Sequence, residues 1–166
     1  PNNCVKPDLN DLGIVGQRIP MVDYAKCRGC KVCQVEKNCP IKVAKMVDGK
    51  VSIDPNACNN CGRCKGKCPF GALEEYQEGY KILIGGRWGK KVAHGIPLTK
   101  IFTSEDEVMD VIEKAILLFR DEGISGERFA DTVARLGFDY VNEKLLGDFI
   151  DKEAVLKKTV KGGATC

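Results

Sequence analysis

Eight of the ten cysteines in this 166-residue chain fall into two short blocks. The first block reads CRGCKVCQVEKNCP and ends at Pro40, and the second reads CNNCGRCKGKCP and ends at Pro69. In each block three cysteines are separated by two residues each, and a fourth cysteine precedes the proline. Three thiolates at this spacing can wrap three corners of one iron–sulfur cubane, so the fourth ligand must come from elsewhere in the chain.

Zinc binding and disulfide bonding are the alternative uses of these cysteines. Structural zinc sites also favour paired C-x2-C motifs, but they rarely pack three cysteines so closely before a Cys-Pro, and the chain has one histidine. Neighbouring cysteines in so dense a run have poor geometry for bridging one another by disulfides. A zinc-stabilised interaction module therefore ranks below iron–sulfur ligation.

The two blocks belong to an internal repeat. VDYAKCRGCKVC at 22–33 aligns with IDPNACNNCGRC at 53–64 at a constant offset of 31 residues. The spacing resembles the bacterial ferredoxin run C-x2-C-x2-C-x3-C-P, in which the remote cysteine ligates the other cluster. Carried onto this chain, that pattern predicts two 4Fe-4S clusters. The first would be held by Cys27, Cys30, Cys33 and Cys68, and the second by Cys58, Cys61, Cys64 and Cys39.

The first block departs from the ferredoxin pattern, because five residues separate Cys33 from Cys39 where three are usual. We therefore expect Cys39 to lie on a longer loop.

The charge balance gives no reason to expect a nucleic-acid partner. The formal net charge is +3, and eight thiolates with two dicationic cluster cores would add about −4. Basic residues nevertheless crowd the cysteines, either as ordinary solvated side chains, or to raise the cluster potentials, or as a docking face for an acidic donor. They are Lys26, Arg28, Lys31, Lys37, Arg63, Lys65 and Lys67.

Segments with strand and helix patterns flank the cysteine blocks. DLGIVGQRIP predicts a short strand over about 12–17, and YKILIGGRWGKKV predicts a strand over 80–84, a glycine-rich turn and a further extended segment. SEDEVMDVIEKAILLFRDEG predicts a long amphipathic helix that opens with a capping box of Ser104 and Glu107 and ends at Gly123. Its buried face would be formed by Val108, Val111, Ile112, Ala115, Leu118 and Phe119.

Two shorter helices should follow the long one. Ser125 is expected to cap a helix over GERFADTVARLG that ends at Gly137, and a third helix is expected over about 142–150.

These segments together resemble the sirohaem-dependent sulfite and nitrite reductases, most closely the anaerobic sulfite reductases and their small or dissimilatory relatives. In that family a sirohaem-binding C-x3-C motif, typically GCPNxC, precedes a strand like DLGIVG and an inserted two-cluster ferredoxin. Segments like YKILIGGRWGK and ERFADTVARLGF follow. PNNC at the start of this chain fits the last four residues of the motif, and the resemblance covers about residues 1–140.

The resemblance implies an α+β fold, with a small bacterial-type two-cluster ferredoxin module inserted into half of a sirohaem sulfite reductase domain. The expected parts are an N-terminal strand segment over 1–19, the ferredoxin domain over 20–76, the remaining α+β domain with its helices over 77–150, and a flexible tail over 151–166. The alternative is a linear array in which an independent helical domain follows the ferredoxin.

The resemblance also implies residues near a sirohaem. Cys4 matches the cysteine that joins a third 4Fe-4S cluster to the sirohaem iron, and Arg87, Lys90 or Lys91 could meet the sirohaem carboxylates. A strand-end turn with solvated lysines explains GGRWGKK equally well. The rest of the sirohaem site has no counterpart here, so we expect a C-terminal fragment of the reductase that has no catalytic residues and is inactive alone.

The leading functional hypothesis is an oxidoreductase fragment that passes electrons from a donor protein or subunit through two clusters toward a sirohaem that reduces sulfite or nitrite. Sirohaem and the third cluster would be present only in the full-length protein. The alternative is a self-contained two-cluster carrier whose helical extension binds a partner. The chain has no apolar run of membrane-spanning length and no signal peptide at its start, so we expect a cytoplasmic protein of anaerobic metabolism.

Overall fold

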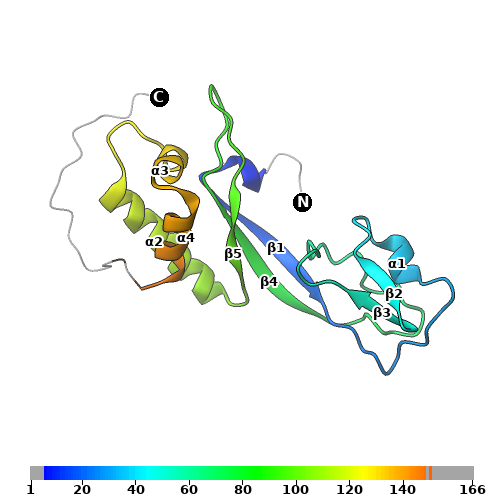
Figure 1. Cartoon of the computed structure of the whole chain (residues 1–166). Helices are drawn as coiled ribbons and strands as arrows, with labels where there is room; N and C mark the ends of the chain where they lie inside the picture. Colours follow the sequence, from blue (N-terminus) through cyan, green and yellow to red (C-terminus); the bar gives the residue numbers. More distant parts are fainter. Residues whose placement is uncertain (1–5, 149, 151–166) are drawn as a thin grey trace. The chain divides into compact units, whose positions relative to one another are not determined.

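The computed structural model describes residues 6–148 and 150. They form two compact units: one joins the residues up to Val15 with those from Tyr80 onward, and the other is Gly16–Gly79 (Figure 1). Helices and strands largely occupy separate stretches of the chain, which confirms the predicted α+β class. No helix within the described ranges is long and apolar enough to cross a membrane. Cys4 and the expected tail over 151–166 lie outside the described residues, and the predicted domain boundaries stay predictions.

A three-stranded sheet with the order β1-β4-β5 contributes to the first unit, although parts of β1 and β4 belong to the second. Its strands are β1 (Leu12–Pro20), β4 (Tyr76–Ile84) and β5 (Ile96–Phe102). β4 and β5 pair antiparallel, with Tyr80 opposite Phe102. The predicted strands and the extended segment are therefore present. β1 and β4 run further than predicted, because their outer ends, RIP and YQEG, lack the apolar alternation on which the prediction rested.

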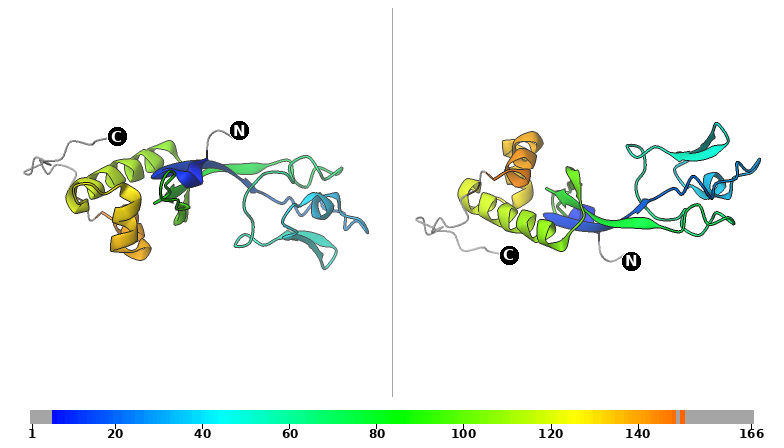
Figure 2. Two further views of the ribbon diagram at one scale, coloured as in Figure 1. Left: turned by 90° about the horizontal axis from the view of Figure 1, so that it is seen from above. Right: turned by 90° about the horizontal axis from the view of Figure 1, so that it is seen from below.

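Three α-helices lie in the described part of the first unit. They are α2 (Glu105–Glu122), α3 (Phe129–Leu136) and α4 (Phe138–Leu146), and a short 3-10 helix spans Pro7–Leu9. Figure 2 shows the three helices gathered in one group, and α2 and α4 both contact β5. The buried core between sheet and helices consists of Ile82, Ile84, Leu98, Phe102, Val108, Val111, Ala115, Leu118, Phe129, Val133, Val141 and Leu145.

Helix α2 follows its predicted pattern closely. The predicted apolar face is the buried one, with Ile112 and Phe119 at its partly buried edge, and Gly123 ends the helix. Ser104 Oγ accepts a hydrogen bond from Glu107 N at 3.2 Å, as predicted. In a capping box the Glu107 side chain would accept a hydrogen bond from the backbone N of Ser104. Here it accepts one from Thr103 N instead, at 3.2 Å, one residue before the cap.

The predicted starts of the two shorter helices are wrong. α3 begins at Phe129, after Arg128 rather than after Ser125. Carboxylates fix this start, because Asp131 accepts from Arg128 N at 3.2 Å and Asp11, far away in sequence, accepts from Ala130 N at 3.3 Å. Gly137 ends α3 as predicted, but its positive φ of 88° also turns the chain directly into α4, which therefore starts earlier than expected.

Among the described residues of the first unit, one charged side chain is buried. Lys114 of α2 is 5% exposed, and its Nζ lies 2.8 Å from an Asp110 carboxylate oxygen and 3.1 Å from an Asp148 carboxylate oxygen. Burial alone would lower the pKa of Lys114, but the two carboxylates raise it above its ordinary value. Lys114 thus keeps its charge while its aliphatic stem is covered, and it ties α2 to the segment after α4.

We expect the buried stem of Lys114 to contribute more to stability than its charge does. Lys114→Met keeps the stem and leaves two solvent-exposed carboxylates, so the free energy of unfolding should fall by less than about 1 kcal/mol. Lys114→Ala opens a cavity and should cost about 2 kcal/mol. Denaturant unfolding followed by the fluorescence of Trp88, which lies in this unit, measures both values. Equal losses would show instead that the ion pairs dominate.

Candidate functional site

The second unit is built around the cysteine blocks. Cys27 is buried in a small apolar core, against which Cys33, Cys39, Cys64 and Cys68 pack. The other members of this core are Val35, Ala44, Val51, Ala72 and Leu73. All eight cysteines from Cys27 to Cys68 are free thiols, and Cys61 is exposed. The structure therefore brings five of the eight cysteines to one apolar core.

The repeat seen in the sequence is also a repeat of backbone conformation. Gly29 and Asn60 occupy equivalent positions between the first and second cysteine of each block, and both have a positive φ, of 67° and 52°. Asn60 N donates to Cys58 Sγ at 3.4 Å, and Gly29 N donates to the Cys27 thiol. Glycine and asparagine are the residues that adopt this left-handed conformation most readily. Each block thus turns a backbone amide onto its first sulfur.

The equivalence continues past the Cys-Pro dipeptides. Lys42 and Gly71 each lie three residues after the last cysteine of a block, with φ of 56° and 73°. Lys42 N donates to Cys39 O at 3.2 Å, and Gly71 N donates to Cys68 O at 3.1 Å. The same turn therefore follows both cysteines, although the first block is longer.

The extra residues of the first block form a helix, where the sequence led us to expect a loop. Helix α1 (Gln34–Asn38) starts directly after Cys33 and ends at Cys39. It places Val35, 1% exposed, into the core. The longer spacing is thus accommodated without moving Cys39 away from the other sulfur atoms.

A hairpin that the sequence analysis missed connects the two blocks. Strands β2 (Ala44–Val47) and β3 (Lys50–Ile53) pair antiparallel around Asp48 and Gly49, which both have positive φ. Asp-Gly between strands is the usual sequence for such a two-residue turn, and it could have revealed the hairpin. The hairpin serves the site, because Val51 N donates to Cys27 Sγ at 3.5 Å and Lys50 Nζ donates to Cys27 O at 2.6 Å.

The thiols differ in their electrostatic surroundings. Hydrogen bonds from the amides of Gly29 and Val51 lower the pKa of Cys27, despite its burial. Burial raises the pKa of Cys39. Hydrogen bonds from the backbone amides of residues 41–44 lower it by more, so the pKa of Cys39 lies below its ordinary value. Amides that favour the thiolate also stabilise a metal-bound sulfur.

Cys64 shows which sulfur atoms are neighbours across the two blocks. Burial raises the pKa of Cys64, and so does the negative charge of Cys58, Cys61 and Cys39. Cys39 belongs to the other block, yet it acts on Cys64 together with the two cysteines of its own block. These four are the residues that the ferredoxin pattern groups around one cluster, so their arrangement fits a shared iron–sulfur group.

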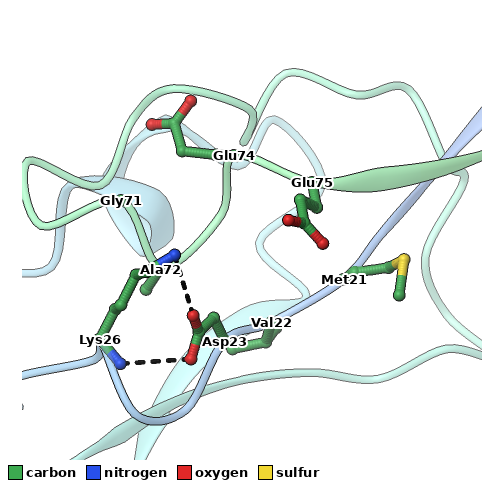
Figure 3. A pocket seen from close by; sticks show the side chains of 8 residues that line it. All are labelled: Met21, Val22, Asp23, Lys26, Gly71, Ala72, Glu74 and Glu75. Carbon is green, nitrogen blue, oxygen red and sulfur yellow. Dashed lines mark hydrogen bonds and ion pairs between the residues drawn. The ribbon is translucent and has the colours of Figure 1, made fainter.

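A small hollow of about 160 Å³ also lies in this unit (Figure 3). Asp23 lines it, pairs with Lys26 at 3.1 Å, and donates through its backbone N to Ala72 O at 2.9 Å. Asp23 and its repeat counterpart Asp54 each accept backbone hydrogen bonds in the turn before a cysteine block. No cysteine lines the hollow, so its residues shape the turn and are not part of the sulfur site.

The residues expected near a sirohaem lie in the first unit. Arg87 Nη1 contacts both carboxylate oxygens of Asp131 at 2.7 Å, and the Arg87 backbone pairs with Ala93. Lys90 and Lys91 are exposed on the same loop. Hydrogen bonding from Arg128 N lowers the pKa of Asp131, and the charges of Arg87 and Lys91 lower it further. Arg87 and Lys91 thus both act on the Asp131 carboxylate. The binding of Arg87, Lys90 and Lys91 to a sirohaem stays a prediction.

Comparison with known protein families matches residues 1–151 to the nitrite and sulphite reductase 4Fe-4S domain. The chain is 34% identical over 145 residues to the coenzyme F420-dependent sulfite reductase of Methanocaldococcus jannaschii, covering 83% of this chain and 22% of that protein. It is 28% identical over 117 residues to the alpha subunit of the dissimilatory-type sulfite reductase of Nitratidesulfovibrio vulgaris, covering 66% of this chain and 26% of that one. The chain thus spans about a quarter or less of these two relatives.

Two further similarities concern the clusters and the fold. An uncharacterised ferredoxin of Methanocaldococcus jannaschii is 32% identical over 90 residues, which are 49% of this chain and 52% of that protein. A solved structure of dissimilatory sulfite reductase I aligns with 92% of this chain, and the alignment covers 42% of the reductase chain, with a TM-score of 0.58 and 20% sequence identity. The second match supports the α+β fold.

A matched pair of glycine substitutions tests the amide contacts at the first sulfur. Gly29 and Gly66 have nearly the same φ, but a Cβ at Gly29 would lie 2.6 Å from Gly49 O, whereas a Cβ at Gly66 would meet nothing. Gly66→Ala should therefore cost only the backbone strain, about 1–2 kcal/mol. Gly29→Ala should cost more and should lower the iron retained per chain. Denaturant midpoints and iron assays compare them, and equal effects would refute a special role for Gly29.

Proposed function

Because the chain belongs to the nitrite and sulphite reductase 4Fe-4S domain family, we propose that it passes single electrons through two 4Fe-4S clusters toward the sirohaem of a sulfite or nitrite reductase. The ligands proposed for the first cluster are Cys27, Cys30, Cys33 and Cys68, and those for the second are Cys58, Cys61, Cys64 and Cys39. The family is one of iron–sulfur oxidoreductases. The electrons would come from a donor protein or subunit in the cytoplasm.

The neighbourhood of Cys64 is the observation that carries this proposal. The charges of Cys58, Cys61 and Cys39 all raise the pKa of Cys64, after the larger effect of burial, so a cysteine of the first block lies near one of the second. A duplicated module in which each block lends its last cysteine to the other requires that arrangement. The matching turns at Gly29 and Asn60 support the same relation between the blocks.

Each part of the chain has a chemical task in this proposal. When bound, the clusters supply the one-electron couples. The eight thiolates hold them, and the amides of Gly29, Val51 and Asn60 donate to sulfur, which stabilises the additional negative charge of the reduced state. Val35 and Leu73 in the core exclude water from one side of the sulfur atoms.

The catalytic part of the reductase would be completed by further protein. We propose that Cys4 joins a third 4Fe-4S cluster to the sirohaem iron, and that Arg87, Lys90 and Lys91 bind sirohaem carboxylates. Arg87 would then share its guanidinium between the cofactor and Asp131. Sulfite or nitrite would be reduced at the sirohaem, and this chain alone would not reduce either one. The match to an uncharacterised ferredoxin favours a second candidate, a self-contained two-cluster electron carrier.

Pairs of cysteine substitutions test the proposed cross-ligation. The anaerobically purified protein should hold about eight iron atoms per chain, and Cys39→Ala with Cys58→Ala should remove one cluster and leave about four. Cys39→Ala with Cys27→Ala should disrupt both clusters and leave almost none. Iron and sulfide assays with visible spectra give the answer. Bound zinc without cluster absorption would refute the proposal, and retention of about four iron atoms in the second pair alone would reverse the ligand assignment.

A further inference from the structure

Exposed basic and apolar side chains surround the proposed ligands of the first cluster. We call this set the Arg28 rim, and it consists of Arg28, Lys31, Val32, Lys67 and Phe70, all of them exposed. Val32 lies between Cys30 and Cys33 with 66% of its surface open to solvent, and Phe70 is 44% exposed. Val32 and Phe70 thus add exposed apolar surface among the cations.

One contact joins the two segments of this rim. The Arg28 guanidinium lies over the Phe70 ring, 5.1 Å from its centroid. Arg28 follows Cys27 directly, and Phe70 lies two residues after Cys68. The pair therefore spans the segments that supply the first and last of these four cysteines, and it holds the apolar ring and the positive charge side by side.

The positive charge of the rim is not neutralised within its unit. Lys26 pairs with Asp23 and Lys45 pairs with Glu36. In contrast, the salt bridges found among the described residues involve none of the three rim cations. The sequence between Asp54 and Glu74 contains no acidic residue at all. The rim therefore presents cations that lack a carboxylate partner.

The second block does not repeat this combination. At the offset of 31 residues, Asn59 stands in place of Arg28, Gly62 in place of Lys31, and Arg63 in place of Val32. The exposed apolar side chain between the second and third cysteines thus occurs only in the first block. The rim is a feature of one cluster's surroundings and not a consequence of the duplication.

We propose that the Arg28 rim docks the acidic face of a one-electron carrier protein. This proposal rests on the proposed function, and it names where the donor binds. Carboxylates of the carrier pair with the three cations, and its apolar side chains cover Val32 and Phe70. One electron leaves the carrier and one reaches the cluster of Cys27, Cys30, Cys33 and Cys68, with no bond formed or broken. Small interfaces that depend on charge are usual for electron transfer.

Binding of oxidised flavodoxin, a small acidic electron carrier, tests the rim without any turnover. Calorimetry with the full cluster-loaded chain should show affinity that falls steeply as salt is raised. Arg28→Glu with Lys31→Glu should weaken binding about tenfold or more. The matched control, Lys37→Glu with Lys81→Glu, makes the same change in net charge on α1 and β4 and should change the affinity by less than about twofold.

Reduction by methyl viologen radical separates the two ways in which the proposal could fail. This small cationic reductant does not need the basic rim for docking, so it should reduce the wild type and both double variants at similar rates. If it reduces them all but the rim variant binds flavodoxin as the control does, the docking proposal is wrong and the proposed function stands. If it reduces none of them, the proposed function is wrong, and so is the docking proposal that rests on it.

Discussion

The gathering of several thiols at one small apolar core is the constraint on which the second unit depends. Burial raises the pKa of Cys64, and the negative charges of Cys58, Cys61 and Cys39 raise it further, so thiolates are costly at this site. The apolar core beside them is small and offers limited compensation. At Cys27 and Cys39, hydrogen bonds from backbone amides outweigh the effect of burial, so the pKa of each thiol lies below its ordinary value. Bound iron would offset the remaining cost of holding thiolates together, so the folding of this unit would be coupled to cluster binding.

Duplication explains how one small unit meets that constraint twice. The turns at Gly29 and Asn60, and again at Lys42 and Gly71, repeat the backbone that faces each set of sulfur atoms. Glycine, asparagine and even lysine occupy these left-handed positions, so the conformation is retained although the side chains differ. The surface has diverged, and the Arg28–Phe70 contact has no counterpart around Asn59. The two equivalent cysteine blocks can thereby face different neighbours.

Sequence reasoning succeeded where the information is local. The apolar face of α2 and the stop at Gly137 depend on residues a few positions apart, and both were predicted. The start of α3 was mispredicted because Asp11, more than a hundred residues away, fixes the amide of Ala130. Helix α1 was missed because five residues carry too little periodicity. The ferredoxin pattern grouped Cys39 with Cys64 from the sequence, but only the folded structure shows that Cys39 influences Cys64.

The electron paramagnetic resonance spectrum of the reduced protein tests the central claim most directly. Two 4Fe-4S clusters held by interleaved ligands lie close together, so both become paramagnetic on reduction and their spins interact. The reduced chain should therefore show a broadened, spin-coupled spectrum that integrates to about two spins per chain. A single uncoupled spectrum of about one spin, or none after full reduction, would contradict the account of this chain as a two-cluster electron relay.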